Sequence, residues 1–204
     1  MLFYETIEPG TLQLLKQLQA HPLFQRERLV GGTALALQLG HRRSVDLDLF
    51  GNEPIESAVI RDALSDEHRL NIVKESRSID IYIVDGIKVD FVHYRYGWID
   101  EAVEEDGIIL AGIKDIAAMK IAAIVGRGTK KDFIDLFFLL RRFTLKEILD
   151  LYMQKFPDGS LFIAMKSLSY FEDAEPDPMP MMFEPVNWVD VKDTIRDNLA
   201  RLEI

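Results

Sequence analysis

The sequence has no cysteine among its 204 residues. This absence excludes disulfide bonds and thiolate-bound metals, and it suits a reducing compartment, so we expect a cytoplasmic protein. Long hydrophobic runs are absent too, because Lys120, Asp132 and Asp135 interrupt the most apolar stretches. None approaches the ~20 apolar residues that span a bilayer. The opening residues MLFYETIEPG lack the basic region of a secretory signal. We therefore expect a soluble protein without a membrane partner.

Basic residues are also scarce, with 24 Lys and Arg against 34 Asp and Glu, a net charge of −10 and a pI near 4.9. This balance opposes broad nucleic-acid binding, since phosphate backbones are held mainly by Lys and Arg. Any nucleic-acid contact must then be local. The positive charge gathers in His41-Arg42-Arg43 and in Arg127 with Lys130-Lys131. Both clusters flank acidic residues, a combination that suits a metal and phosphate site.

The hydrophobic periodicity predicts a mixed sheet with a helical appendage, an α/β (α+β) fold. Strands are expected at residues 28–30, 44–50, 71–75, 79–84 and 87–93, the last two joined as a hairpin by Asp85-Gly86. Helices are expected at residues 10–20, 33–40, 55–64, 114–125, 130–143, 145–156, 161–168 and 188–202. We expect an α/β core at residues 1–112 and a helical lobe at residues 113–204.

Two aspartates alternate with apolar residues in the stretch SVDLDLF, a pattern typical of a half-buried strand. On such a strand Asp46 and Asp48 point the same way, with Cα atoms roughly 6.5 to 7 Å apart. Val45, Leu47 and Leu49 then face the core and anchor the acids. Hard cations such as Mg²⁺ prefer carboxylate oxygens. The pair is therefore either a metal site or the solvated face of an edge strand.

A glycine turn, Gly31-Gly32-Thr33, stands between a predicted strand and a predicted helix. Backbone N–H groups and the helix dipole at such a point bind phosphate oxygens. Alone, the turn is ordinary, and Thr33 indicates only a helix N-cap. Asp90, flanked by Val89 and Phe91, supplies either a third carboxylate or another solvated strand position. Taken together, these parts predict a site for metal and nucleotide.

An ordered set of motifs spans residues 29–140: GGTALAL, HRRSVDLDLF, KVDF, AMKIAAI and RGTKKDFIDL. This set resembles the AbiEii/AbiGii-type nucleotidyltransferase family, whose members include toxins of type IV toxin–antitoxin systems. The family belongs to a superfamily that shares the DNA polymerase β-like palm. The resemblance implies a palm with a mixed sheet and a C-terminal helical lobe, an NTP substrate, and an antitoxin partner encoded nearby.

The resemblance also implies roles for individual residues. Asp46 and Asp48 would bind Mg²⁺ (or Mn²⁺), Asp90 would be the third acid of the site, and Gly32 and Thr33 would contact the nucleotide phosphates. The other residues that we place at the nucleotide are Gly31, Arg43, Ser44 and Arg127.

On the helix predicted at residues 130–143, Lys131 lies four residues from Asp135, and Asp132 lies three residues from it. All three can share one side, which is either a solvated salt-bridged face or part of the site. The resemblance favours a function for Lys131 and Asp135. Lys120 interrupts an apolar helix, where it either extends outward or reaches into a cleft.

The predicted reaction is in-line attack of an RNA hydroxyl, such as one of tRNA, or a protein hydroxyl on the α-phosphate of an NTP, with release of pyrophosphate. Two rivals remain. One is a catalytically silent nucleotidyltransferase fold that serves as a binding partner. The other is a phosphotransferase that moves the γ-phosphate.

The segment at residues 169–185 has five acids, four prolines and neither Lys nor Arg. It cannot sustain a regular helix or an inner strand. We interpret it as an extended surface segment. The alternative is that it docks on the basic residues near the cleft and gates the acceptor.

Overall fold

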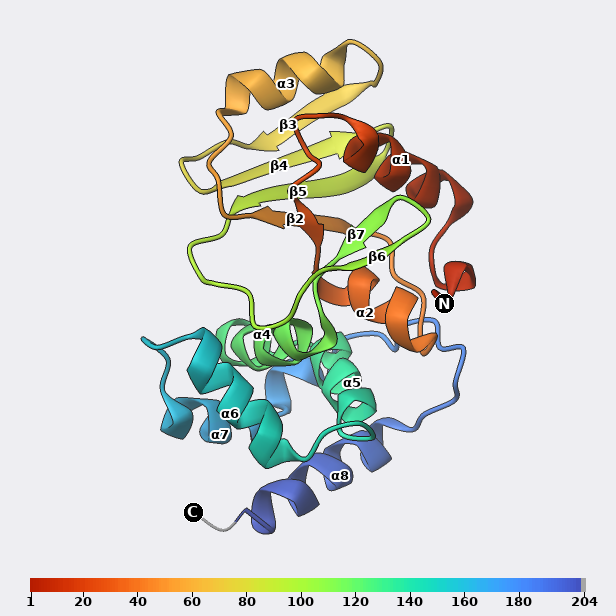
Figure 1. Ribbon diagram of the computed structural model, residues 1–204. Helices are drawn as coiled ribbons and strands as arrows, with labels where there is room; N and C mark the ends of the chain where they lie inside the picture. The colour runs from red at the N-terminus through yellow and green to blue at the C-terminus, as the bar shows by residue number, and fades with distance from the viewer. Residues whose placement is uncertain (203–204) are drawn as a thin grey trace.

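The computed structural model describes residues 1–202 of the chain. Its upper half in Figure 1 is built on a mixed seven-stranded sheet with the order β3-β4-β5-β2-β1-β7-β6. The pairs β2–β5 and β1–β7 are parallel, and the other neighbouring pairs are antiparallel. The strands are β1 (Arg28–Leu29), β2 (Leu47–Gly51), β3 (Leu70–Lys74), β4 (Ile79–Val84), β5 (Ile87–His93), β6 (Val103–Glu105) and β7 (Ile108–Leu110).

Helices cover the sheet and form the lower half of the molecule (Figure 1). The α-helices are α1 (Pro9–Ala20), α2 (Gly31–Leu39), α3 (Ser57–Ser65), α4 (Ile113–Gly126), α5 (Lys130–Leu139), α6 (Leu145–Lys155), α7 (Leu161–Leu168) and α8 (Trp188–Ala200). Short 3-10 turns stand at Tyr4–Thr6 and Glu172–Ala174. Helix α4 contacts α2, α5, α6 and α7, so it joins the helical half to the helix that follows β1.

The predicted mixed α/β fold is confirmed, and so is the hairpin of β4 and β5 around Asp85 and Gly86. Two predictions about the central strand need correction. Strand β2 begins at Leu47, the first residue that pairs with β5, so Asp46 precedes it. Val45 is 53% exposed and does not anchor the strand in the core. The hairpin of β6 and β7 around Asp106 and Gly107 was not predicted.

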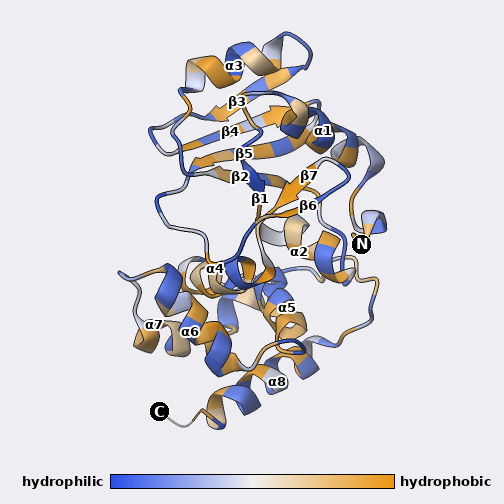
Figure 2. Cartoon of the chain, viewed as in Figure 1, coloured by the Kyte–Doolittle hydropathy of each residue, from blue (hydrophilic) through white to orange (hydrophobic). Residues whose placement is uncertain are grey.

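The hydrophobic core is one continuous cluster that runs from the sheet through α2 and α4 into the helical half. Leu47 and Leu49 of β2, Leu35 of α2, Ile121 of α4 and Phe133 of α5 all belong to it. Hydrophilic residues interrupt the helices along their length (Figure 2). No helix among residues 1–202 is long and apolar enough to cross a membrane.

The segment at residues 169–185 is more than surface padding, because part of it is built into the core. Phe171 and Ala174 are buried, and Phe171 packs on Phe133 with ring centroids 4.8 Å apart. Further along, the Arg43 N–H donates to the Met181 carbonyl at 2.8 Å. The segment therefore crosses the molecule and docks on the backbone of residues 41–43. Gating of an acceptor stays a prediction.

Candidate active site

The glycine turn lies where β1 ends and α2 begins, with Asp48 directly beside it. Gly31 has a φ of +69°, and a Cβ there would collide with the Asp48 carboxylate. A Cβ on Gly32 would collide with the Arg42 guanidinium. Only glycine at both positions lets the carboxylate and the guanidinium approach the backbone so closely. The turn thus brings the unpaired N–H groups of a helix start next to an acid.

Asp48 and Asp90 lie side by side because β2 and β5 are parallel and pair them in register. Burial raises the pKa of Asp48, and the nearby carboxylates of Asp90 and Asp46 raise it further. The three acids are thus close enough to influence one another. Asp48 and Asp90 are neighbours on the parallel strand pair, while the convergence of Asp46 with them stays a prediction.

The three carboxylates differ in their partners. Asp90 is paired with Lys88, whose Nζ lies 2.6 Å from Oδ1. None of the ion pairs formed within residues 1–202 uses the carboxylate of Asp48. In the same part of the chain, no group of three or more His, Cys, Asp or Glu side chains is arranged to hold a metal ion. The chemistry of the donors still fits a hard divalent cation, because such cations prefer carboxylate oxygens and Asp48 lines the cavity without an ion pair in this part of the chain. Asp90 would have to exchange Lys88 for that cation.

Thr33 lies inside the first turn of α2, which begins at Gly31 with Val30 as its N-cap. The predicted start of this helix at Thr33 is therefore corrected by two residues. The Thr33 hydroxyl donates to the backbone carbonyl of Asp46 and lies 2.9 Å from the Ser44 Oγ. These hydrogen bonds of the Thr33 hydroxyl fix the position of the backbone that leads into Asp46 and Asp48.

Beneath the glycine turn, Asp135 of α5 is the centre of a buried charge cluster. Arg42 donates to it through Nε at 2.7 Å and through Nη2 at 2.8 Å. His41 Nε2 lies 2.8 Å from Oδ1, and Lys120 Nζ lies 2.6 Å from Oδ2. Asp135 is completely buried, and His41 and Arg42 are nearly so. The solvated face, which was one alternative for this side of the helix, is therefore wrong for Asp135.

Asp132, one turn earlier in α5, shares Lys120 with Asp135 and also binds Arg127. Arg127 donates to it from Nε at 2.9 Å, and Lys120 Nζ lies 3.2 Å away. The Thr129 hydroxyl donates to the same carboxylate at 2.5 Å. Both carboxylates thus form ion pairs with Lys120, and Asp132 also forms one with Arg127.

Burial and charge compete in this cluster. Burial by itself would raise the pKa of Asp132, but Lys120 and Arg127 outweigh it and lower the pKa to about 2. For Asp135, Arg42 and Lys120 overcome complete burial and hold the pKa well below its usual range. Burial lowers the pKa of His41 despite its contact with Asp135. Both carboxylates are therefore ionised at neutral pH, while His41 is neutral.

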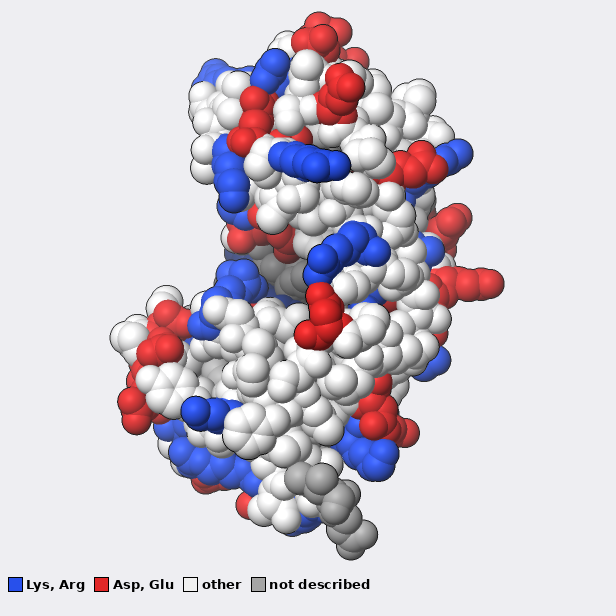
Figure 3. All heavy atoms as spheres, turned by 90° about the vertical axis from the view of Figure 1, so that its left-hand side faces the viewer, with Lys and Arg blue, Asp and Glu red and all other residues white. Residues whose placement is uncertain are grey.

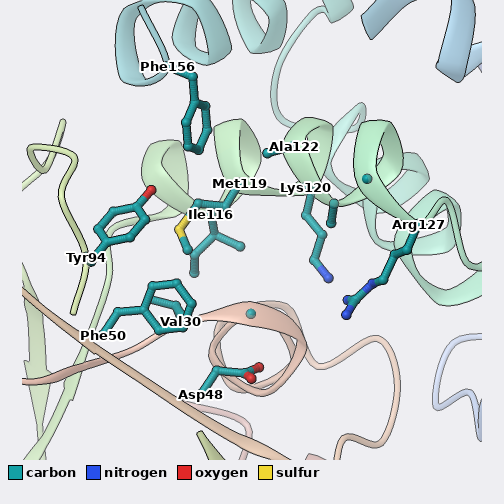
Figure 4. Close-up of a pocket in the computed structure, with 13 residues that line it drawn as sticks. Val30, Asp48, Phe50, Tyr94, Ile116, Met119, Lys120, Ala122, Arg127 and Phe156 are labelled. Carbon is teal, nitrogen blue, oxygen red and sulfur yellow. The ribbon is translucent and has the colours of Figure 1, made fainter. Parts of the chain in front are cut away.

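A cavity of about 350 Å³ opens beside the glycine turn, between the sheet and α4. Figure 4 shows Asp48 from β2 below this space and Lys120 and Arg127 reaching toward it from α4. In the space-filling view, the hollow between the two halves has both basic and acidic side chains on its rim (Figure 3). Its lining comprises Val30, Gly31, Asp48, Phe50, Tyr94, Ile116, Met119, Lys120, Ala122, Ala123, Gly126, Arg127 and Phe156.

Not every predicted site residue faces this cavity. Lys131 is exposed on α5, whereas Asp132 and Asp135 are fully buried, and Lys131 does not line the cavity. Arg43 pairs with Glu8 at 2.7 Å instead of lining the cavity. Ser44 lies behind the glycine turn, near Gly32 and Thr33.

Sequence reasoning overlooked the apolar part of the cavity, formed by Phe50, Tyr94, Ile116, Met119 and Phe156. Two signals could have found some of these residues. Ile116, Met119, Lys120, Ala123 and Arg127 recur at helical spacing of three and four residues, which places them on one face of α4. The stretch YRYGW, which follows β5, is unusually aromatic for a connection.

Comparison with known proteins agrees with this geometry. A model of the family described as nucleotidyl transferase AbiEii toxin, type IV TA system, matches residues 13–106. An uncharacterised protein of Aquifex aeolicus is 42% identical over 152 residues, which cover 72% of this chain and 74% of that protein.

Two solved structures share the fold. The first is MenT4, a nucleotidyltransferase toxin of Mycobacterium tuberculosis H37Rv, with a TM-score of 0.64, 16% identity, and coverage of 93% of this chain and 81% of that one. The second is JHP933 from Helicobacter pylori, with a TM-score of 0.60, 21% identity, and coverage of 95% and 92%. The chain therefore belongs to the AbiEii family of nucleotidyl transferase toxins, which confirms the family, the fold and the enzyme class that its motifs predicted.

Proposed function

We propose that this nucleotidyltransferase moves a nucleoside monophosphate from an NTP to a hydroxyl group of an RNA or protein acceptor, with a divalent cation such as Mg²⁺. The observation that carries the proposal is the Asp48 carboxylate, which packs against Gly31 at the start of α2, lines the cavity and forms no ion pair within residues 1–202. A carboxyl group whose pKa is raised in this way is neutralised either by a proton or by a bound cation, and a divalent cation stabilises its ionised form. Beside it, the start of α2 offers N–H groups to phosphate oxygens.

Asp46, Asp48 and Asp90 would hold the cation, which supplies neutralisation of phosphate charge when bound. The acceptor oxygen attacks the α-phosphorus, the bond from that phosphorus to the bridging oxygen of the β-phosphate breaks, and pyrophosphate leaves. Asp90 accepts the proton of the acceptor hydroxyl. The backbone at Gly31 and Gly32 orients the phosphates, and Lys120 and Arg127 contribute positive charge from the opposite wall. Asp132 and Asp135 position these two cations.

The transferred group is identified with an NTP labelled either at the α or at the γ position, incubated with Mg²⁺ and total cellular RNA or protein. Nucleotidyl transfer leaves only the α label on the acceptor. Transfer of the γ label would instead show a phosphotransferase, and no labelling with any of the four NTPs would favour the silent binding partner.

The site is tested in the same assay with Asp48→Asn. Loss of the carboxylate should lower the rate at least ~100-fold, because metal binding supplies several kcal/mol of transition-state stabilisation. Asp62→Asn, at an exposed position of α3, is the matched control and should leave the rate unchanged. An active Asp48→Asn enzyme contradicts the site.

Membership of a toxin family supports a toxic activity that an antitoxin partner counteracts. Growth of cells that express the chain gives a second readout for the same variant. Growth arrest by the native chain and normal growth with Asp48→Asn would link toxicity to nucleotidyl transfer. Equal arrest by both chains would show that toxicity does not depend on nucleotidyl transfer.

A further inference from the structure

The cavity is polar at one end and apolar at the other. Asp48 and Phe50 stand two residues apart on β2, so they face the same side about 6.6 Å apart along the strand. On α4, Ile116 and Met119 line the end beside Phe50, and Arg127 lines the end beside Asp48 (Figure 4). A ligand whose phosphates lie at Asp48 would therefore extend its other end among apolar side chains.

Two aromatic rings approach the apolar end from opposite halves of the molecule. Phe50 comes from β2 in the sheet, and Phe156 comes from the residue that ends α6 (Figure 4). Met119 and Ile116 form the wall between them. Flat apolar walls of this kind suit a planar heterocycle, since stacking on an aromatic side chain contributes favourably with any nucleobase.

The hydroxyl of Tyr94 stands at this apolar end. It is buried and has no hydrogen-bond partner within residues 1–202. The Tyr94 side chain points into the space near Met119 and Phe156 (Figure 4). A buried hydroxyl without a partner is uncommon and costs stability unless something binds it. This atom thus indicates a ligand with a polar edge.

The position of Tyr94 is firmly fixed. Its N–H donates to the Gly51 carbonyl at 2.7 Å, and its own carbonyl accepts from Asn52 at 2.6 Å. The ring packs on Phe50 and Trp98, with centroids 5.2 and 5.3 Å away, and the Lys155 ammonium lies 4.9 Å from its centre. A hydroxyl held this rigidly discriminates between ligands that offer it a partner and ligands that do not.

We propose that the apolar end of the cavity binds the base of the NTP between Phe50 and Phe156, and that the Tyr94 hydroxyl, by hydrogen bonding to the edge of that base, determines which base is preferred. This inference rests on the proposed function, because it places the phosphates at Asp48. The cavity volume lies within the ~300–1,000 Å³ range of small-molecule sites. A polymeric acceptor would need an open groove, whereas the Tyr94 hydroxyl is buried.

The test compares Tyr94→Phe with the native enzyme in Mg²⁺-dependent binding of ATP, GTP, CTP and UTP, measured by calorimetry. Phenylalanine keeps the ring and removes only the hydroxyl. We expect about 3- to 10-fold weaker binding of the preferred NTP, the range of one hydrogen bond, and less than about twofold change for the others. In the transfer assay the loss should appear in KM and not in kcat. Equal binding of all four NTPs by the native enzyme, or an equal effect of Tyr94→Phe on all four, overturns the proposal.

Two controls separate local from general effects. Tyr96→Phe removes a hydroxyl that already bonds to Asp158 outside the cavity, and it should leave base preference unchanged. Binding of inorganic tripolyphosphate should be the same in the native and Tyr94→Phe proteins. If NTPs bind no better than tripolyphosphate while the α label is still transferred, the base site is wrong and the proposed function stands. If base preference depends on Tyr94 but no α label is transferred, the proposed function fails and the base site stands.

Discussion

Burial acts in the same direction on Asp48 and on Asp135, but their surroundings give opposite outcomes. Asp135 is surrounded by Arg42, Lys120 and His41, so its pKa lies well below the usual range. Asp48 has two carboxylates nearby and no ion pair, so its pKa is raised. The first arrangement is complete without a ligand, while the second needs a cation. The residue type is the same in the two cases, but Asp135 is fully buried among cations, whereas Asp48 is partly buried beside other acids at the edge of the cavity.

Glu27 shows the same physics outside the active site and leads to a pH prediction. Burial, followed by the charge of Glu53, raises the pKa of Glu27 from 4.5 to about 7. Between these pH values the folded protein keeps a proton that the unfolded chain has lost. The free energy of unfolding therefore falls as the pH rises from 4.5 to 7, by on the order of 3 kcal/mol from this group, and the effect levels off above pH 7.

Urea unfolding at pH 5, 6, 7 and 8 measures this contribution. Glu27→Gln should unfold with a flatter pH dependence than the native chain, because the amide does not titrate. Glu67→Gln, at an exposed position, should keep the native slope. Identical slopes for Glu27→Gln and the native chain would show that Glu27 titrates normally in the folded protein.

At the scale of elements, predictions succeeded where a local pattern decides the structure. The hairpin of β4 and β5 follows from two alternating runs and a turn at Asp85-Gly86. The same signal exists around Asp106-Gly107, but the flanking strands have only three residues each, too few for a clear alternation. Asp46 was assigned to a strand by alternation alone, whereas pairing begins only at Leu47. Element ends depend on partners that the sequence pattern does not reveal.

The sequence allowed the acidic residues of the site to be predicted, but not the side chains that surround them. Asp48 and Asp90 stand on separate strands, and the order of the motifs correctly predicted that they lie together. The environment of Asp135 depends on His41 and Arg42, more than 90 residues away in the chain. Tyr94 and Phe156 lie in connections between elements, where periodicity gives no information about direction. Long-range packing decides these features.

Helix α5 contributes Asp135 to a buried charge cluster, which gives a stability prediction. Asp135→Asn leaves the cations of Arg42 and Lys120 buried with too little negative charge nearby. Loss of one partner from a buried ion pair costs about 3–5 kcal/mol, so the urea midpoint should fall strongly. Asp150→Asn is the matched control, because Asp150 pairs with Lys146 on the surface. Its cost should stay below about 0.5 kcal/mol. Similar losses from both variants would mean that the cluster adds little to stability.

The whole molecule has a sheet half and a helical half that meet at α2 and α4, with the cavity at their junction. Gly31, Asp48 and Phe50 line it from one side, and Lys120 and Phe156 line it from the other. The segment at residues 169–185 ties the halves together a second time, since Met181 bonds to Arg43 while Phe171 packs in the helical core. A domain boundary at residue 112 stays a prediction. A ligand in the cavity contacts both halves, so its binding stabilises their association.

This arrangement predicts that NTP with Mg²⁺ raises the melting temperature of the entire chain in a single transition. At a ligand concentration 100 times the Kd, binding to the folded state adds about 2.7 kcal/mol. For a chain of this size, that corresponds to a Tm increase of roughly 5–10 °C in calorimetry. Asp48→Asn should lose most of the increase, because the cation no longer links the phosphates to the sheet, while Asp62→Asn should retain it. If the ligand shifted only part of the unfolding transition, it would be bound to one half alone, and the junction would not be the binding site.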